Sequence, residues 1–370
     1  MRVQLVDPSA YTPPYDHALA GALARAGAEV ELLTSRFVHG ERPPVEAFAV
    51  REEFYRRATS RAHSRNARRL LRAAEHVPDM LRYRTTARGA DVRHYQWLPL
   101  EALDWLLLAP ARPRVMTMHN VLRRGTGRVA VGATRQLVSR MDALVVHTRT
   151  GAAELIQRFG ADPDRVHVIP HGALDYLTRL PEESGLPPDL QVVDGPVILW
   201  FGLLRPYKGV DVLLEAFRNL EGVELWIVGM PHVDMEPLRA AAARARGRVR
   251  FVERFVADRE IAAYFRRADV VVLPHRRVDQ SGVLYTALAF GKPIVMSDIG
   301  GFSEVASEHG AARLVAPENP EALRDALAEL VADPAARAAL AAAAGAAAAG
   351  PYAWDQIGRR TLALYERLLA

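Results

Sequence analysis

Two series of short apolar runs, each alternating with helical segments, limit the fold of this chain more than any other feature. The first series covers residues 2–7, 29–34, 91–96, 114–119, 143–148 and 166–170, and the second covers 197–202, 223–229, 249–253, 269–274, 293–298 and 312–316. Near-continuous apolar strands separated by helices are typical of parallel sheets that helices cover on both faces. The predicted fold class is therefore α/β, with two doubly wound, Rossmann-like domains.

The stretch between the two series predicts where the domains divide. It is rich in proline, glycine and acidic residues, lacks periodicity, and is interpreted as a linker over 176–195. The first domain is then 1–175 and the second 196–350, followed by an amphipathic helix within 351–370. Two such domains would place a deep cleft between the carboxyl ends of their sheets, where open α/β sheets bind ligands.

The absence of cysteine narrows the chemistry that this chain can carry. It excludes disulfides and thiolate metal sites, and it favours a cytoplasmic location. No apolar run approaches the roughly 20 residues of a membrane span, and the N-terminus lacks the apolar core of a signal peptide. We therefore expect a cytoplasmic protein.

Arginine crowds the segment 51–93, and the whole chain carries a formal net charge of +5. A solvated helical face is the simplest interpretation of such a run. The alternatives are peripheral contact with an anionic inner-membrane surface and binding of an anionic substrate. Because the segment contains no recognisable nucleic-acid-binding motif, no specific nucleic-acid partner is expected.

Lysine occurs only at positions 208 and 292, although lysine and arginine together number 48. Lys208 and Arg205 lie in the loop RPYKG, after the apolar run that ends at Gly202. A planar guanidinium and a compact ammonium both suit phosphate oxygens, although a basic loop that only caps a helix has the same composition. Lys292 follows the glycine that stops a helix, so we expect it to bond the last carbonyls of that helix.

The stretch QSGVLYTALAFGK predicts a short helix from Gly282 to Phe290. The first N–H groups of a helix have no partner inside it, and Ser281 and Gly282 would leave them sterically open. The N-terminus of such a helix binds anions through these donors and through the helix dipole. An ordinary capped core helix would begin in the same way.

The stretch SDIGGFSEV, residues 297–305, is a glycine-rich turn in which Glu304 is expected to open the next helix. Its carboxylate could accept hydrogen bonds from ligand hydroxyls, or it could serve only as a first-turn acid. Together with the cations and backbone donors, this inventory fits a sugar nucleotide. The glycine motifs that bind nucleoside triphosphates and dinucleotides are both missing.

Four stretches together resemble retaining glycosyltransferases of family 4 (GT4), which have the GT-B fold. They are FGLLRPYKGVDVLLEAF, RVHVIPHG, the run from residue 268 to 305, and the C-terminal WDQIGRRTLALYERLL. The resemblance implies a hexosyltransferase that takes its sugar from a nucleotide-diphosphate donor, with no metal and no cofactor. It leaves the acceptor open among a glycan, a lipid-linked sugar and a small molecule. It also implies that the last helix crosses back onto the first domain.

The resemblance assigns site residues by position. The catalytic positions are Arg205, Lys208 and His119. The donor-binding positions are Gly202, Asp279, Gln280, Ser281, Gly282, Val283, Thr286 and Glu304. The acceptor-side candidates in the first domain are Tyr11, Tyr15 and His171, although both tyrosines could equally pack on the adjacent helix.

The acidic pair of the family is missing from this chain. Its two glutamates, one for the donor sugar and one for the ribose, would fall on Val278 and Thr286. The QSGV pattern resembles a subset of the family that also lacks the pair, and Asp279 could take the sugar role. Thr286 offers the ribose only one hydroxyl.

The implied mechanism is a front-face transfer with retention, in which the acceptor proton passes to the leaving phosphate. The two cations and the helix start would stabilise the leaving diphosphate, and His119 would lie near the donor sugar or the acceptor. Two other functions fit the same fold. A sugar-nucleotide epimerase would need an acid–base group, and the missing glutamates would suit a catalytically weak sugar-nucleotide-binding protein.

Overall fold

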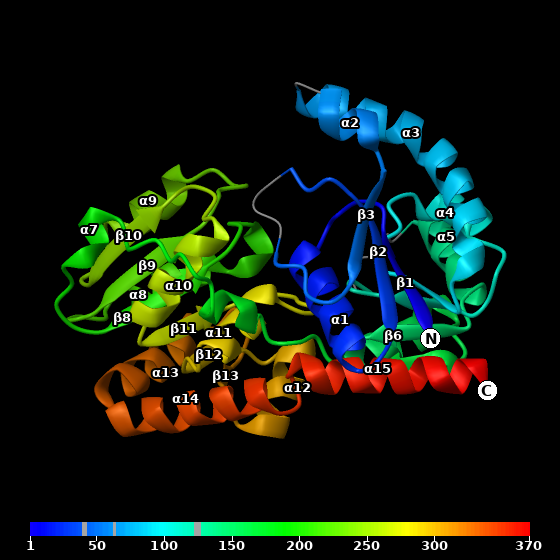
Figure 1. Ribbon diagram of the computed structural model, residues 1–370. Coiled ribbons are helices and arrows are strands. Elements are labelled where there is room, and N and C mark those ends of the chain that lie inside the picture. Colours follow the sequence, from blue (N-terminus) through cyan, green and yellow to red (C-terminus); the bar gives the residue numbers. More distant parts are fainter. Residues whose placement is uncertain (39–42, 62–63, 122–126) are drawn as a thin grey trace. The chain divides into compact units, whose positions relative to one another are not determined.

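The computed structural model describes residues 1–38, 43–61, 64–121 and 127–370. The chain forms two compact units, one of Met1–Gly172 with Trp354–Ala370, and one of Ala173–Ala353 (Figure 1). Each unit contains one parallel sheet with helices on both faces. The predicted α/β class with two doubly wound sheets is therefore confirmed.

The sheet of the first unit has the order β3-β2-β1-β4-β5-β6-β7, and all neighbouring strands are parallel. Its strands are β1 (Arg2–Asp7), β2 (Glu29–Ser35), β3 (Ala49–Phe54), β4 (Val92–Tyr95), β5 (Arg114–Thr117), β6 (Ala143–Val146) and β7 (Val166–Val168). The sequence predicted six of them and missed β3. That strand, AVREEF, lies at the edge of the sheet, where charged side chains are common, and so it lacks an apolar run.

Helices cover this sheet on two faces. They are α1 (Pro13–Arg25), α2 (Arg56–Arg61), α3 (Arg65–Thr86), α4 (Glu101–Leu107), α5 (Arg128–Ser139), α6 (Arg149–Phe159) and α15 (Trp354–Leu369). Helices α1 and α15 share one apolar core with the sheet, and α3, α5 and α6 contribute to the other. The C-terminal helix α15 runs beside α1 (Figure 1), and its Tyr365 hydroxyl lies 2.5 Å from Nδ1 of His94 on β4.

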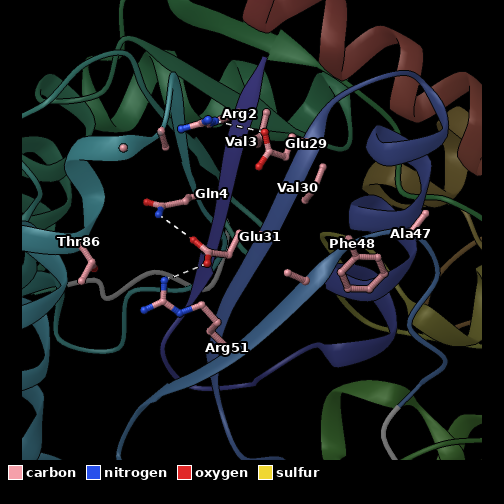
Figure 2. Close-up of a pocket in the computed structure, with 13 residues that line it drawn as sticks. Arg2, Val3, Gln4, Glu29, Val30, Glu31, Ala47, Phe48, Arg51 and Thr86 are labelled. Carbon is pink, nitrogen blue, oxygen red and sulfur yellow. Dashed lines mark hydrogen bonds and ion pairs between the residues drawn. The ribbon is translucent and has the colours of Figure 1, made fainter.

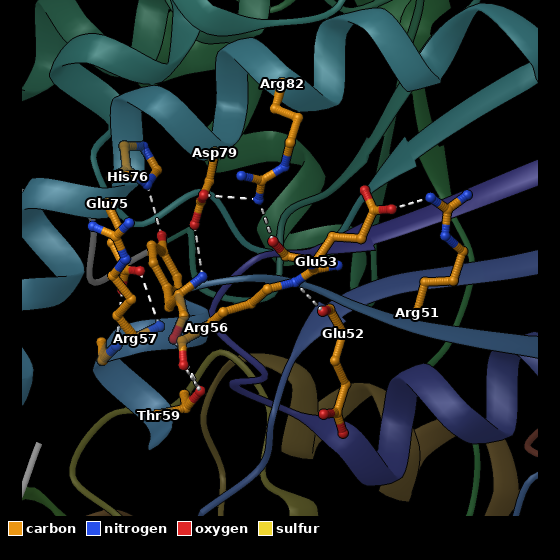
Figure 3. Close-up of polar contacts among 12 residues, drawn as sticks. Arg51, Glu52, Glu53, Arg56, Arg57, Thr59, Glu75, His76, Asp79 and Arg82 are labelled. Carbon is orange, nitrogen blue, oxygen red and sulfur yellow. Dashed lines mark hydrogen bonds and ion pairs between the residues drawn. The ribbon is translucent and has the colours of Figure 1, made fainter. Parts of the chain in front are cut away.

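Several cations of the arginine-rich segment 51–93 pair within the first unit. Figure 2 shows the row in which Gln4 and Arg51 each bond Glu31 at 2.9 Å. Figure 3 shows Arg82 bonding Asp79 at 2.8 Å. Arg51 on β3 and Arg82 on α3 are therefore paired within this unit. The hollow of about 590 Å³ around Arg51 contains none of the predicted site residues.

The sheet of the second unit has the order β10-β9-β8-β11-β12-β13, again with parallel neighbours. Its strands are β8 (Val197–Phe201), β9 (Glu224–Val228), β10 (Arg248–Val252), β11 (Val270–Leu273), β12 (Ile294–Ser297) and β13 (Arg313–Val315). The strand order reverses direction between β8 and β11. Ligands of open α/β sheets bind at the carboxyl ends of the two strands that flank such a switch point.

Two layers of helices cover the second sheet. Helices α8 (Val210–Phe217), α9 (Glu236–Ala242) and α13 (Pro320–Ala332) share one apolar core. Helices α10 (Asp258–Arg267), α11 (Gly282–Ala289), α12 (Gly300–His309) and α14 (Pro334–Ala349) share the other. Over the part of the chain that the structure describes, no single helix is long and apolar enough to cross a membrane, although one sharply bent pair passes the same test of length and composition.

The segment 176–195, which was predicted as a linker, belongs to the second unit. It contains the short helix α7 (Pro188–Gln191), and Leu190 is fully buried in the core. The Tyr176 hydroxyl donates to Asp258 at 2.7 Å, and Glu183 pairs with Arg266 at 2.6 Å. The segment therefore packs against the second unit, because its few apolar and aromatic side chains find partners there.

Candidate functional site

The two loops at the switch point of the second sheet bring predicted site residues together. Gly202 directly follows β8 and has a φ of +119°, which favours glycine. An added Cβ at Gly202 would lie 2.7 Å from Nζ of Lys208 and 3.4 Å from Cγ2 of Val283. The bare backbone of Gly202 therefore leaves room for the Lys208 ammonium next to the first turn of α11.

The loop that carries the two predicted cations packs directly on the end of β11. A Cβ at Gly209 would lie only 1.9 Å from the carbonyl oxygen of Pro274. Arg276 also holds this loop. Its guanidinium donates to the Asp211 carboxylate at 2.6 Å, and its backbone N–H donates to the carbonyl oxygen of Tyr207 at 2.8 Å. Hydrogen bonds to Asp211 and then Glu318 raise the pKa of Arg276, so it remains a cation. These contacts hold the loop against the end of β11.

Arg205 and Lys208 present their charges differently. Nζ of Lys208 lies 5.7 Å from the ring centroid of Trp200, within the range of a cation–π contact. The Arg205 guanidinium forms no ion pair with any residue that the structure describes, and it lines a groove of about 600 Å³ with Tyr207 and Arg277. A half-exposed guanidinium beside open space is available to an anion.

Helix α11 begins at Gly282, as predicted. Ser281 is extended and 7% exposed, and its side chain makes no capping hydrogen bond. A Cβ at Gly282 would meet no atom within 4 Å. The start of this helix therefore faces open space, beside the ammonium of Lys208.

Thr286 already has a partner inside its own helix, and Glu304 lies further into its helix than expected. The Thr286 hydroxyl is buried and donates to the carbonyl of Gly282 at 2.9 Å, one turn back in its own helix. Helix α12 begins at Gly300, so Glu304 lies in its second turn and does not open it. Gly300 has a φ of +46°, and a Cβ there would lie 2.8 Å from the carbonyl of Val278. Only glycine therefore fits at position 300 without backbone strain or a clash with that carbonyl.

Asp279 and Gln280 belong to the loop that leads into α11. Asp279 is 9% exposed, and Val278 beside it is buried. The carboxylate is therefore close to the helix start in sequence but is mostly covered by the protein.

Lys292 bonds a helix other than the one that was predicted. Its ammonium donates to the carbonyls of Arg266 and Ala268, each at 2.9 Å, at the C-terminal end of α10. Burial lowers its pKa. The capping role is as expected, but the helix that it caps is α10 and not α11.

The first unit gathers the acceptor-side candidates at the carboxyl ends of its strands. The ring centroid of Tyr15 lies 4.7 Å from that of His119 and 5.0 Å from that of His171. Tyr15 is only 2% exposed, so it packs in the core below these histidines. Tyr11, by contrast, is 63% exposed.

Trp97 is a residue that the sequence analysis missed. Its ring is stacked on that of His119, with centroids 4.7 Å apart and an interplanar angle of 7°. The Tyr11 ring is tilted by 49° against the Trp97 ring, with centroids 4.5 Å apart. Its indole N–H donates to Thr12 at 2.7 Å. Trp97 follows β4, and β4 and β1 flank the switch point of the first sheet. Because ligands bind at the carboxyl ends of such strands, this position alone could have marked Trp97 as a candidate site residue.

A buried pair of carboxyls holds the loop after β1. Asp7 accepts the backbone N–H groups of Ser9 at 3.0 Å and Tyr11 at 2.7 Å. Asp16 lies beside Asp7, and burial, followed by the charge of Asp7, raises its pKa well above the usual range. The protonated form of Asp16 can donate a hydrogen bond to Asp7, and Asp7 in turn holds the backbone of the loop that carries Tyr11.

Family comparisons match both units. The family model described as "Glycosyltransferase Family 4" matches residues 15–173, and the model "Glycosyl transferases group 1" matches residues 195–333. The D-inositol 3-phosphate glycosyltransferase of Xylanimonas cellulosilytica is 33% identical, over 94% of this chain and 89% of that protein. The chain belongs to glycosyltransferase family 4. The D-inositol 3-phosphate glycosyltransferase of Kineococcus radiotolerans is 29% identical to the present chain, over 94% of this chain and 88% of that protein.

Solved structures show the fold of the glycosyltransferase. Sucrose-phosphate synthase from Thermosynechococcus elongatus has a TM-score of 0.77 at 20% identity, covering 100% of this chain and 99% of its own. HepE of Anabaena in complex with UDP-glucose has a TM-score of 0.73 at 19% identity and covers both chains fully. These likenesses identify the fold as GT-B.

Proposed function

We propose that this glycosyltransferase transfers a hexose from a nucleotide-diphosphate sugar to an acceptor hydroxyl with retention of anomeric configuration. The observation that carries the proposal is the convergence, at one switch point, of the Lys208 ammonium, bare Gly202 and the open start of α11. Backbone donors, a dipole and a cation at one point fit a diphosphate better than any uncharged group.

The proposed chemistry places developing negative charge on the leaving diphosphate. Lys208 and Arg205 would bind its oxygens, and the first N–H groups of α11 would donate to them. These groups supply positive charge at the position where a metal ion would otherwise do so, so the proposal needs no metal. Asp279 is the carboxylate nearest in sequence to the helix start, and we assign it to the donor sugar.

Names of similar proteins suggest the first compounds to try. One structural neighbour is described as a complex with UDP-glucose, and the curated relatives are named for D-inositol 3-phosphate. We therefore propose a UDP-hexose as donor, and a phosphorylated polyol as one small-molecule acceptor. That the chain belongs to the subset of the family with QSGV in place of the acidic pair stays a prediction.

The proposal is tested by product analysis. The protein is incubated with UDP-, GDP-, ADP- or dTDP-glucose, with and without D-inositol 3-phosphate, and the products are followed by NMR. We expect an α-linked glucoside from an α-configured donor, formed only when both substrates are present. A β-linked product would contradict retention, and a new sugar nucleotide formed without acceptor would indicate an epimerase. Donor binding with no turnover, with or without D-inositol 3-phosphate, would favour the binding-protein alternative, which the buried Thr286 hydroxyl supports.

A further inference from the structure

Three histidines follow three neighbouring strands of the first sheet. His119 follows β5, His147 follows β6 and His171 follows β7, and all three are buried. His119 and His147 are directly linked, since Nδ1 of His119 lies 3.2 Å from Nε2 of His147. A hydrogen bond between two imidazoles requires one nitrogen to donate and the other to accept, so the proton positions of the two rings are coupled.

The backbone fixes the proton of His147. Its Nδ1 lies 3.0 Å from the carbonyl oxygen of Ile169, which can only accept. His147 Nδ1 must therefore carry a hydrogen. Burial lowers the pKa of His147 to about 4, so the ring is neutral near pH 7 and its Nε2 has a lone pair. That lone pair accepts a hydrogen bond from His119, which places a hydrogen on Nδ1 of His119.

The other nitrogen of His119 faces Gln96. Nε2 of His119 lies 3.1 Å from the Gln96 amide position assigned to oxygen, while the buried position assigned to nitrogen has no hydrogen-bond partner. Amide oxygen and nitrogen are assigned from such networks, and exchanging them lets the Gln96 N–H donate to His119 Nε2. Four groups then form one directional chain, from Gln96 through His119 and His147 to the carbonyl of Ile169.

We propose that His147 is a positioning residue that holds His119 in the Nδ1–H form and so makes His119 Nε2 a hydrogen-bond acceptor. A substrate hydroxyl can take the place of the Gln96 amide at this nitrogen. The inference deepens the proposed function, because it rests on His119 belonging to the substrate site. His147 itself touches no substrate in this assignment.

The first test reads the tautomer directly. Protein with ¹⁵N-labelled histidine is studied by two-bond ¹H–¹⁵N correlation spectra near pH 7.5, and the His119 signals are assigned from their loss in His119→Gln. We expect the wild-type protein to have hydrogen on Nδ1 of His119 and a lone pair on Nε2. Hydrogen on Nε2 in the wild type would overturn the proposal, with no variant of His147 required.

Two variants of His147 form a matched pair. The amide oxygen of His147→Gln can replace the accepting Nε2, so His119 should keep hydrogen on Nδ1. His147→Leu removes the acceptor, and His119 should shift toward the Nε2–H form with the Gln96 oxygen as its new partner. Gln96→Leu serves as the control at the other end and should leave hydrogen on Nδ1. A His119 tautomer that follows Gln96 and ignores His147 would contradict the proposal.

Kinetics separates this inference from the proposed function. With UDP-glucose and D-inositol 3-phosphate, His147→Leu should lower kcat by roughly tenfold or more with little change in the donor KM, and His147→Gln should recover most of it. If the tautomer shifts in His147→Leu and kcat stays unchanged, the positioning role of His147 stands, while the assignment of His119 to the substrate site is wrong. An unshifted tautomer overturns the inference whatever the rate.

Discussion

The ammonium of Lys208 lies 2.7 Å from the point that a Cβ on Gly202 would occupy. Gly202→Ala should therefore displace the ammonium while leaving its charge in the protein. The φ of +119° adds backbone strain, on the order of 1–3 kcal/mol. We expect a nucleoside diphosphate to bind roughly tenfold more weakly, as measured by titration calorimetry at a temperature where circular dichroism confirms the fold. Unchanged affinity in a folded variant would remove Lys208 from the diphosphate site.

Gly282→Ala tests the helix start without backbone strain. Gly282 is helical, and its added Cβ would meet no protein atom within 4 Å, so the free energy of unfolding should change by less than about 1 kcal/mol. The methyl group would occupy the space through which a phosphate approaches the backbone N–H groups. Calorimetry should show weaker nucleoside diphosphate binding in a protein of unchanged stability. Full affinity would mean that the ligand does not approach this turn.

Lys292→Met should lower stability and spare binding. The side chain of Lys292 donates to two carbonyls at the end of α10, and methionine keeps its length but removes both hydrogen bonds. We expect a loss of about 1–3 kcal/mol in the free energy of unfolding from urea titration. A stability equal to that of the wild type would contradict the capping role.

The titration of Asp16 should lower the free energy of unfolding as pH rises, which is opposite to the usual effect of a carboxyl group. Its folded-state pKa is raised by burial and by Asp7, so between the usual carboxyl pKa and this raised value the folded chain holds more protons than the unfolded chain. Protonated Asp16 therefore contributes fully to the free energy of unfolding below the usual carboxyl pKa, and this contribution is lost as pH rises through the raised pKa of Asp16.

Asp16→Asn keeps the hydrogen bond to Asp7 and removes the titration. The variant should be more stable than the wild type above the raised pKa, and the difference should shrink as pH falls toward 4. Urea unfolding at pH 5, 6, 7 and 8 measures it. A difference that is the same at every pH would show that Asp16 does not titrate with a raised pKa.

Local patterns predicted the strands and the two loops of the candidate site, because buried parallel strands are apolar and a loop between strand and helix begins where the apolar run ends. Strand β3 was not predicted because it has no apolar run: at the edge of the sheet it carries the charged residues Arg51, Glu52 and Glu53. Glu304 was expected to open the next helix, but α12 begins four residues earlier in the chain, at Gly300.

Contacts between residues distant in the sequence could not be predicted in this way. Trp97 bonds Thr12 across 85 residues, and Lys292 caps a helix that ends about 25 residues earlier in the chain. His147 bonds His119 only because β5 and β6 are neighbours in the sheet. Such pairs depend on which strands lie side by side, and no local pattern specifies a side-chain contact across a sheet.

The central claim is that Arg205 and Lys208 bind the diphosphate of the donor. Calorimetric titration of UDP, GDP, ADP and dTDP into the wild-type protein, Arg205→Ala, Lys208→Met and Lys292→Met tests it most directly. We expect at least one diphosphate to bind the wild type and Lys292→Met equally, and to bind Arg205→Ala and Lys208→Met at least about tenfold more weakly, since each loses a charged hydrogen bond worth roughly 1.5–3 kcal/mol. Equal affinity of all four proteins for the nucleotide that binds would contradict the claim.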